Sequence, residues 1–540
     1  MKKNGRILIV DDEHIWRDLL VEKLQKDGFH AEAVPSSTEA LKRLEETLYH
    51  LLILDIRLDN DTSNIDGVEL LGELKKRGLS EATKVIMFSA HGTKDHMRLA
   101  FKDYGVADFL SKDPFDAHSF LENVHTAFSE HVNINLGLDV IWEKSVSEQA
   151  VLNLEVNGMR VERGTPLCER MTSELEDLLC RLFSDAEGIL VRPLMPTPSR
   201  SGTGVLWVRP FYAAAAGHAV VVKFGYFAKI EEEQRRFKTF VRPFVAGARN
   251  TTIVNTGRTP HLGGIVYSLL GAANDNWVEF AHFYRTSTAE QVREAIKRLF
   301  QDTCSAWYAS PGRLYPHNLT EMYGNQLSTS HEEIKQGIVK NLSSVLLRHG
   351  KLSFDALSER HDFVDPFEAI KGKTFVYTTY ECITHGDLNQ HNILMDSAKG
   401  MWLVDFENTE RSHILRDVAT LDAVVRFQLL GADEATLDKR LLMERALNSI
   451  DRFKQVETLT AAFTTENTAV ARAYATVVQL RLLAQWLVDQ NPDDDMSEYY
   501  VALLYNALAT LDYSSLQPAQ QEHALLSASL LAQKLTANQV

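Results

Sequence analysis

The chain has 540 residues, which is too long for one hydrophobic core and predicts three or four structural units. Hydrophobic residues make up 45% and charged residues 24%, as in ordinary globular proteins, so the composition requires no disordered tract. The formal net charge of −16 argues against non-specific binding to nucleic acids, and no compact helix-turn-helix with a basic face is recognisable. We therefore expect no nucleic-acid partner.

Two further features of the composition concern the cellular compartment. The apolar runs are far shorter than a membrane span, so we expect no membrane partner. The four cysteines are scattered without the spacing of a metal site or of a disulfide framework, which fits a reducing cytosol. We expect a cytoplasmic protein.

Each of four apolar runs near the N-terminus ends in polar side chains. Helical stretches such as 16–25 and 37–46 alternate with these runs, which predicts a doubly wound α/β sheet of parallel strands. Ligands of such sheets gather at the carboxyl ends of the strands, so the polar side chains should meet at one point. The polar residues that follow the runs are Asp11 with Asp12, Asp55, Ser89 and Lys112.

This pattern, over roughly residues 4–130, resembles the receiver domain of two-component response regulators, a (βα)5 fold. The resemblance implies that Asp55 takes a phosphoryl group from a sensor histidine kinase. It also implies that Asp11, Asp12 and Asp55 hold Mg²⁺, which lowers their mutual repulsion and orients the phosphoryl donor. We assign residues 1–130 to the receiver domain.

The resemblance also assigns residues that respond to phosphorylation. Lys112 and the Ser89 hydroxyl would contact the new phosphoryl oxygens, and Phe109 occupies the position of the switch aromatic residue. One departure from the family is the long acidic and polar loop 58–67, because the usual turn there is shorter and contains proline. The oligomeric state stays open, with a homodimer formed through the receiver among the options.

Residues 131–188 are expected to be a linker and a helical segment. Apolar residues around 175–183 recur at spacings of three and four, which predicts one buried helical stripe. Strand-like runs follow in the order expected of a nucleotide-binding sheet. A small-residue turn at 198–204 precedes a strand at 205–208, and a β-branched run then carries Lys223.

The turn and the lysine together suggest a phosphate site. Lys223 would reach the α and β phosphates of ATP, and Glu233, with Glu232 as the alternative, would hold it from the following helix. Backbone N–H groups of the turn would lie over the phosphates, although a plain hairpin also explains the turn. The turn residues assigned to this role are Ser201, Gly202 and Gly204.

The most informative motif lies further along the chain. Residues 384–392 read Thr-His-Gly-Asp-Leu-Asn-Gln-His-Asn, and an apolar run then ends in Asp-Phe-Glu at 405–407. In-line phosphoryl transfer needs an acceptor-positioning carboxylate, here Asp387, on the same loop as a neutral oxygen ligand for Mg²⁺, here Asn392. Asp405 would approach the metal from the neighbouring turn. The pattern predicts an ATP-dependent and Mg²⁺-dependent phosphotransferase site.

These motifs resemble the aminoglycoside phosphotransferase and choline kinase-like branch of the kinase fold. His-Gly-Asp stands in place of His-Arg-Asp, and Asp-Phe-Glu lacks a final glycine. The resemblance implies a small lobe at 189–284, in which a strand at 277–284 leads into the hinge, and a mostly helical large lobe at 285–540. It also makes Asp417 a structural anchor that hydrogen-bonds the catalytic loop.

Long apolar stripes at 469–488 and 499–511 predict helices of this large lobe. The candidates for lining an acceptor pocket are Arg481, Trp486 and the pair Tyr499 and Tyr500, although core packing is the simpler interpretation. The acid-rich stretch 491–495 is interpreted as a loop and helix N-cap.

The fold class predicted for the whole chain is α/β plus α+β, with a doubly wound receiver followed by a bilobal kinase-like domain. The first functional hypothesis is a response regulator whose receiver controls ATP-dependent transfer to an unknown small-molecule or protein acceptor. The alternative is a nucleotide-binding pseudokinase or scaffold that binds signalling partners without catalysis. A third interpretation keeps only the receiver active and treats the remainder as a partner-binding platform.

Overall fold

The computed structural model divides the chain into two compact units. The first comprises Met1–Gln234 and Thr252–Leu269, and the second comprises Arg235–Thr251 and Leu270–Val540. The residues that the structure describes are 4–58, 66–90, 94–143, 147–194, 202–213, 215–244, 250–270, 277–309, 311–327, 329–359, 361–489, 491 and 493–537.

The N-terminal part of the first unit contains a five-stranded sheet in the order β2-β1-β3-β4-β5, and all its neighbouring strands are parallel. This confirms the predicted parallel sheet. In β1, Leu8 and Val10 face one side of the sheet and Ile7 and Ile9 face the other, so both faces are buried. The strands are β1 (Arg6–Val10), β2 (His30–Val34), β3 (Leu51–Leu54), β4 (Lys84–Ser89) and β5 (Asp108–Ser111).

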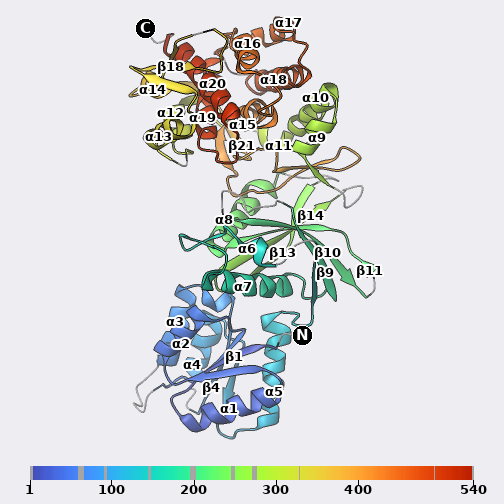
Figure 1. Ribbon diagram of the computed structural model, residues 1–540. Coiled ribbons are helices and arrows are strands. Elements are labelled where there is room, and N and C mark those ends of the chain that lie inside the picture. Colours follow the sequence, from blue (N-terminus) through green and yellow to red (C-terminus); the bar gives the residue numbers. More distant parts are fainter. Residues whose placement is uncertain are drawn as a thin grey trace. The chain divides into compact units, whose positions relative to one another are not determined.

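Helices cover both faces of this sheet (Figure 1). Leu20 and Leu24 of α1 pack with Phe120 and Val124 of α5 on one face, whereas α2 and α3 pack on the other. Ser36 begins α2 by accepting a hydrogen bond from the Glu39 backbone N–H. The helices are α1 (His14–Lys26), α2 (Ser37–Glu46), α3 (Asp66–Lys76), α4 (Lys94–Leu99) and α5 (Ala117–Thr126).

The remainder of the first unit is built on a second sheet, which contains seven strands in the described part of the chain. Its main path runs β13-β14-β12-β10-β9-β6, and β11 pairs with β10. The segment 131–188 contributes β6, which pairs in parallel with β9, so it is more than a linker. The strands are β6 (Asp139–Trp142), β9 (Gly188–Pro193), β10 (Gly204–Tyr212), β11 (Ala215–Ala216), β12 (Val220–Tyr226), β13 (Asn250–Arg258) and β14 (Leu262–Leu270).

A long helix, α7 (Pro166–Leu182), packs on this second sheet. Leu175, Leu178, Leu179 and Leu182 form its buried stripe, and they lie in one apolar core with residues of β9, β10, β12 and β14. The amphipathic helix predicted around 175–183 is therefore confirmed. Shorter elements complete this part of the chain: α6 (Ser147–Val151), β7 (Glu155–Val156), β8 (Met159–Arg160) and α8 (Phe227–Arg236).

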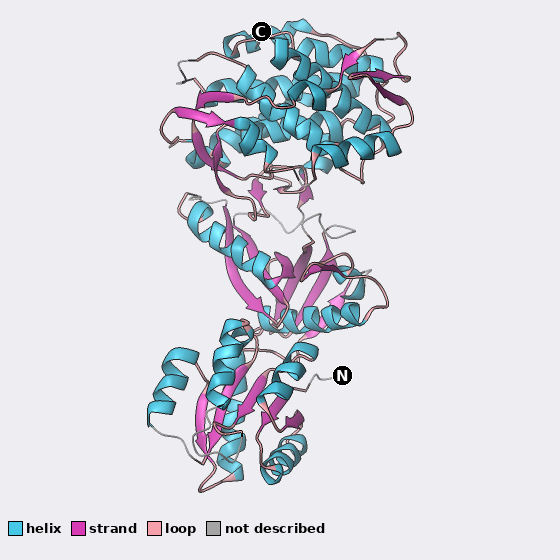
Figure 2. Cartoon of the chain, turned by 90° about the vertical axis from the view of Figure 1, so that its left-hand side faces the viewer, coloured by secondary structure: helices cyan, strands magenta, loops and turns pink. Residues whose placement is uncertain are grey.

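The second unit consists mainly of helices, shown in cyan in Figure 2. The helices predicted at 469–488 and 499–511 are confirmed as α18 and α19. The helices of this unit are α9 (Phe280–Thr286), α10 (Ala289–Arg298), α11 (Ser305–Tyr308), α12 (Leu319–Gly324), α13 (His331–Asn341), α14 (Pro366–Ile370), α15 (Arg416–Val424), α16 (Leu437–Leu447), α17 (Leu459–Ala462), α18 (Thr468–Leu487), α19 (Ser497–Thr510) and α20 (Pro518–Ala537).

Small sheets interrupt these helices. The ladders β15-β22-β23 and β21-β24 flank the motif at 384–392, because the motif connects β21 to β22. The strands are β15 (Val278–Glu279), β16 (Tyr315–Asn318), β17 (Val345–Arg348), β18 (Lys351–Phe354), β19 (Phe363–Val364), β20 (Val376–Thr379), β21 (Glu381–Thr384), β22 (Ile393–Met395), β23 (Met401–Leu403) and β24 (Glu410–His413).

The strand predicted at 277–284 is wrong beyond its first residues. Only Val278 and Glu279 pair with β22, and α9 begins at Phe280. Phe280 and Tyr284 are buried on one side of this helix, four residues apart, so the apolar run follows the helical period. The part of the chain that the structure describes contains no helix with the length and apolar character needed to cross a membrane.

Candidate functional site

The carboxyl edge of the five-stranded sheet gathers charged side chains. Lys112 follows β5, and its Nζ lies 2.5 Å from Asp55 Oδ2 and 2.7 Å from Asp11 Oδ2. All three residues are buried. Burial disfavours the ammonium group of Lys112, but its bonds to Asp11 and Asp55 outweigh this effect and raise its pKa. The lysine therefore supplies the positive charge between two strand-end carboxylates.

The same edge offers a set of oxygen ligands. Carboxylate oxygens of Asp11, Asp12 and Asp55 lie within 4.8 Å of one another. Hydrogen bonds orient two of these groups, because the Glu13 N–H donates to Asp11 Oδ1 and the Ile56 N–H donates to Asp55 Oδ1. Burial raises the pKa of Asp11 to about 6, against the opposing influence of Lys112. Clustered carboxylates of this kind fit Mg²⁺, which prefers hard oxygen ligands.

Two further predicted residues lie on the neighbouring strands. Ser89 is buried at the carboxyl end of β4, and Phe109 in β5 is half-buried and packs against the core beneath α2 and α3. In the register of the sheet, Met87 lies beside Phe109. Most of the unusual loop 58–67 lies outside the described residues.

In the second sheet, Lys223 forms a buried ion pair. Its Nζ lies 2.7 Å from Glu233 Oε2, and both side chains are at most 2% exposed. Tyr267 Oη donates a hydrogen bond to Glu233 Oε1 at 2.7 Å. Of the two glutamates considered, Glu233 is the one that faces Lys223, because it is buried on α8 whereas Glu232 is only half-buried.

The glycines of the small-residue turn have packing roles of their own. Gly202 has φ +69°, and a Cβ placed there would lie 2.6 Å from Glu155 Cβ. A Cβ on Gly204 would collide with the ring of Phe224. Glycine is therefore required at both positions whether or not the turn contacts phosphate. Ser201 lies outside the described residues.

In the second unit, a buried carboxylate holds the start of the motif at 384–392. Asp417 Oδ2 accepts hydrogen bonds from the His385 N–H at 2.7 Å and from Tyr308 Oη at 2.9 Å, and Oδ1 accepts from the Gly386 N–H at 3.0 Å. Gly386 has φ +84°, and a Cβ there would clash with the Asn408 carbonyl group. A side chain cannot be accommodated in this turn, which explains the glycine of the His-Gly-Asp motif.

Two asparagines organise Asp387. Asn392 Nδ2 donates to the Asp387 carbonyl oxygen at 2.8 Å and to Asp387 Oδ2 at 3.2 Å, and Asn389 Nδ2 donates to Oδ2 at 3.0 Å. Burial, followed by the charge of Asp405, raises the pKa of Asp387. Asp405 itself adopts φ +69°, a strained backbone conformation of the kind found at functional sites. Sequence reasoning gave no role to Asn389, although an asparagine two residues from the aspartate is the signal that could have identified it.

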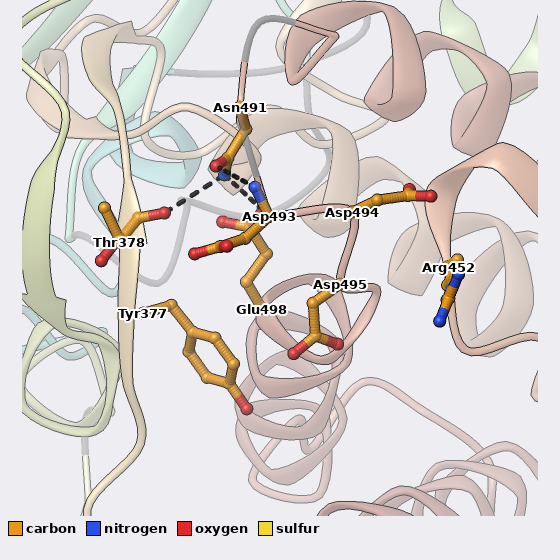
Figure 3. A pocket seen from close by; sticks show the side chains of 8 residues that line it. All are labelled: Tyr377, Thr378, Arg452, Asn491, Asp493, Asp494, Asp495 and Glu498. Carbon is orange, nitrogen blue, oxygen red and sulfur yellow. Dashed lines mark hydrogen bonds between the residues drawn. The ribbon is translucent and has the colours of Figure 1, made fainter.

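A separate hollow of about 390 Å³ lies in the second unit (Figure 3). Asn491 Nδ2 donates to the Thr378 carbonyl oxygen across one side of the hollow, and Asp495 accepts from the Ser497 N–H at the start of α19. The predicted N-cap is displaced by one residue, because Met496 is the N-cap of α19 and makes no capping hydrogen bond, whereas Asp495 precedes it. The lining residues are Tyr377, Thr378, Arg452, Asn491, Asp493, Asp494, Asp495 and Glu498. Arg481 does not line this hollow, because it is fully buried among core residues.

The N-terminal part of the chain is similar to known proteins. Residues 7–125 match the response regulator receiver domain family. Over 110 residues the chain is 40% identical to the putative response regulator NtrX-like of Rickettsia felis, a match that covers 20% of this chain and only 22% of that protein. The chain also covers 91% of an uncharacterized 14.6 kDa protein of Leptolyngbya boryana, at 31% identity over 124 residues.

Solved structures match the same part. The receiver domain of NtrX from Brucella abortus is 31% identical, with 98% of that chain and 23% of this one covered and a TM-score of 0.21. The sequence matches and the parallel sheet define the N-terminal part as a response regulator receiver domain. Residues 190–338 and 322–512 match a second family, and together they span more than half of the chain. This protein belongs to the family described as Ternary complex associated domain 9.

Proposed function

We propose that this protein is a phosphorylation-controlled response regulator in which Asp55 accepts a phosphoryl group from a sensor histidine kinase. The observation that carries the proposal is the buried contact of Lys112 with both Asp55 and Asp11. In the transfer, the P–N bond of the phosphohistidine breaks, a P–O bond to an Asp55 oxygen forms, and the imidazole keeps the electron pair.

The residues at the carboxyl edge of the sheet have different roles in this phosphoryl transfer. Lys112 neutralises charge beside the acceptor oxygen, and the Ile56 N–H holds the other oxygen of Asp55 at 2.6 Å, so the carboxylate keeps one orientation. Asp11 and Asp12 would hold Mg²⁺ together with Asp55, and the metal would supply charge neutralisation on the phosphoryl oxygens.

Phosphorylation of the full chain by acetyl phosphate and Mg²⁺ tests this assignment, with the phosphoprotein resolved on a phosphate-affinity gel. The wild type should give one retarded band, and Asp55→Asn should give none. Asp27→Asn is the matched control, because Asp27 pairs with His125 away from the edge and should leave phosphorylation unchanged. Equal phosphorylation of the Asp55 variant would refute the assignment.

For the remainder of the chain, we propose a kinase-like domain that transfers the γ-phosphate of ATP to an unidentified small-molecule or protein acceptor. The buried Lys223–Glu233 pair supports an ATP-binding lysine in the first unit. Within the second unit, the loop that holds Asp387 against Asn392, and the strained Asp405, support a catalytic carboxylate and two ligands for Mg²⁺.

A nucleotide-binding scaffold without catalysis is the second candidate. Two observations favour it. The matching family is described by its association with a ternary complex, which suggests a role in assembly. In addition, packing against Glu155 and Phe224 already accounts for Gly202 and Gly204, so these glycines do not require a phosphate-binding turn.

Magnesium-dependent ATP binding and ADP release by the full chain separate these candidates, measured with and without beryllofluoride as a phosphoryl mimic at Asp55. Turnover that responds to the mimic and disappears in Asp405→Asn would support the kinase. Asp396→Asn is the matched control, since Asp396 accepts from the Gly400 N–H in a neighbouring turn. Binding without turnover in either state would favour the scaffold, and absence of binding would leave only the receiver active.

A further inference from the structure

A second cavity, of about 370 Å³, lies in the first unit at the contact between the receiver domain and the second sheet. The receiver contributes Lys84, at the amino end of β4, and His131, beyond α5. The second part contributes Arg181 of α7 and Arg258 of β13. The cavity therefore lies at the amino edge of the parallel strands, roughly 17 Å along β4 from the carboxyl edge that holds Asp55.

Arg181 lines this cavity and has a hydrogen-bond donor without a partner among the described residues. The residue is only 7% exposed. Its Nε donates to Asp177 Oδ2 at 2.7 Å, whereas its buried Nη2 has no hydrogen-bond partner among the described residues. Asp177 also contacts the receiver domain, because its Oδ1 lies 2.7 Å from Nε2 of His50. Burial would raise the pKa of Asp177, but Arg181 and His50 hold it well below its ordinary value.

Arg258 adds further unused donors. Its Nη1 lies 2.7 Å from Glu231 Oε1, but the buried Nε and Nη2 have no partner among the residues that the structure describes. The guanidinium lies 3.7 Å from the centre of the Phe227 ring, which holds its plane in place. A Cβ on Gly78 of the receiver would lie 2.6 Å from Nη2, so the arginine reaches the receiver surface. Burial lowers the pKa of Arg258, which shows the cost of its charge there.

Buried donors without partners cost about 1–3 kcal/mol each and require an explanation such as a bound ion or water. Three such nitrogen atoms belong to two arginines that line one cavity, and guanidinium groups bind oxyanions through several hydrogen bonds at once, so an anion bound there would supply acceptors for them. Lys84 adds a third cation, and its Nζ lies 3.8 Å from Glu81, which also lines the cavity. The cavity volume also falls within the range of small-molecule sites.

We propose that this cavity binds a small molecule through an oxyanion group, a phosphate or a carboxylate, held by Arg181, Arg258 and Lys84. The bound group would contact both the receiver and the second sheet, and it would adjoin the Arg181–Asp177–His50 chain that joins them. It would therefore stabilise the contact between the domain that is phosphorylated and the part that follows it. The proposal is independent of whether the remainder of the chain is a kinase.

Isothermal titration of the full chain with inorganic phosphate tests this site, and titration with acetate distinguishes a phosphate site from a carboxylate site. The protein is first exchanged into a metal-free buffer without carboxylate or phosphate, because without a divalent cation the carboxylates around Asp55 repel an added anion. The expected result is one phosphate or one acetate per chain, and at least tenfold weaker binding in Arg258→Gln.

Two further variants make the test decisive. Lys84→Met removes a cation that is 24% exposed, so this variant should fold normally, and it should weaken binding about threefold to tenfold. Arg163→Lys is the matched control, because Arg163 is exposed, pairs with Glu148 and is not among the lining residues. Absence of binding to wild type, or undiminished binding in Lys84→Met, would overturn the proposal whatever the folding of the Arg258 variant.

Discussion

Asp417→Asn should release the loop that carries Asp387. The carboxylate accepts two backbone N–H groups and one hydroxyl group, and it is fully buried. An asparagine keeps only one acceptor oxygen. Whichever way the amide is oriented, the N–H of either His385 or Gly386 then faces a donor.

The size of the effect follows from the lost interaction. A hydrogen bond to a charged acceptor contributes about 1.5–3 kcal/mol, and 1.4 kcal/mol corresponds to a tenfold change in a local opening equilibrium. Hydrogen exchange of a peptide spanning 384–389 should therefore become about 10-fold to 100-fold faster, as measured by mass spectrometry on the native chain. Transfer activity, where present, should fall with it.

The control for this experiment is another buried aspartate in the same unit. Asp365 caps α14 by accepting from the Phe367 N–H, so Asp365→Asn should accelerate exchange near 366–370 and leave 384–389 unchanged. Unaltered exchange at 384–389 in Asp417→Asn would refute the reasoning. Equal acceleration by both variants would show general destabilisation instead of a local anchor.

Three further outcomes are expected. Lys223→Met should remove the rise in melting temperature that Mg²⁺-ATP gives the wild type in differential scanning fluorimetry, whereas an equal rise would exclude the lysine from the nucleotide site. Glu444→Gln should destabilise the helical unit by about 3 kcal/mol in urea, because Arg426 would lose one of its two buried carboxylate partners and keep only Asp422 among the described residues. Burial lowers the pKa of His523 from 6.5 to about 4, so the unfolded chain binds a proton there before the folded chain does. The free energy of unfolding should therefore be highest above pH 6.5 and should fall by about 3 kcal/mol as the pH drops from 6.5 to 4. His523→Gln should flatten that part of the stability profile, and an unchanged slope would contradict the assignment.

The receiver could be predicted from sequence because its information is local. Each strand is a short apolar run, and the polar residue of the candidate site follows the run directly, as Asp55 follows β3. Parallel pairing then brings these ends to one edge without any knowledge of loop geometry. The contact between Asp387 and Asn392 is local as well, because the two residues lie five positions apart in one turn.

Short apolar runs are ambiguous when their length suits either a strand or a helix. Residues 280–284 illustrate this, because Phe280, Phe283 and Tyr284 fit a helical face as well as a hydrophobic strand. Tertiary packing decides between the two, and the sequence offers no strong turn or cap signal there. The pairing of β6 with β9 escapes prediction for a related reason, since β6 has only four residues and is partly exposed.

Contacts between residues that are far apart in the chain are the hardest to predict from a single sequence. His50 and Asp177 are 127 residues apart, and neither belongs to a recognisable motif. Lys223 and Glu233 are separated by ten residues, and here helix phase carries a signal: Ile230, Glu233 and Phe237 share the buried face of α8 and its continuation. A glutamate at the apolar phase of an amphipathic helix must find a cation, because an isolated buried carboxylate is too costly. Glu232 lies one position away from that phase and can remain in water, so the helical period by itself favours Glu233 as the partner of Lys223.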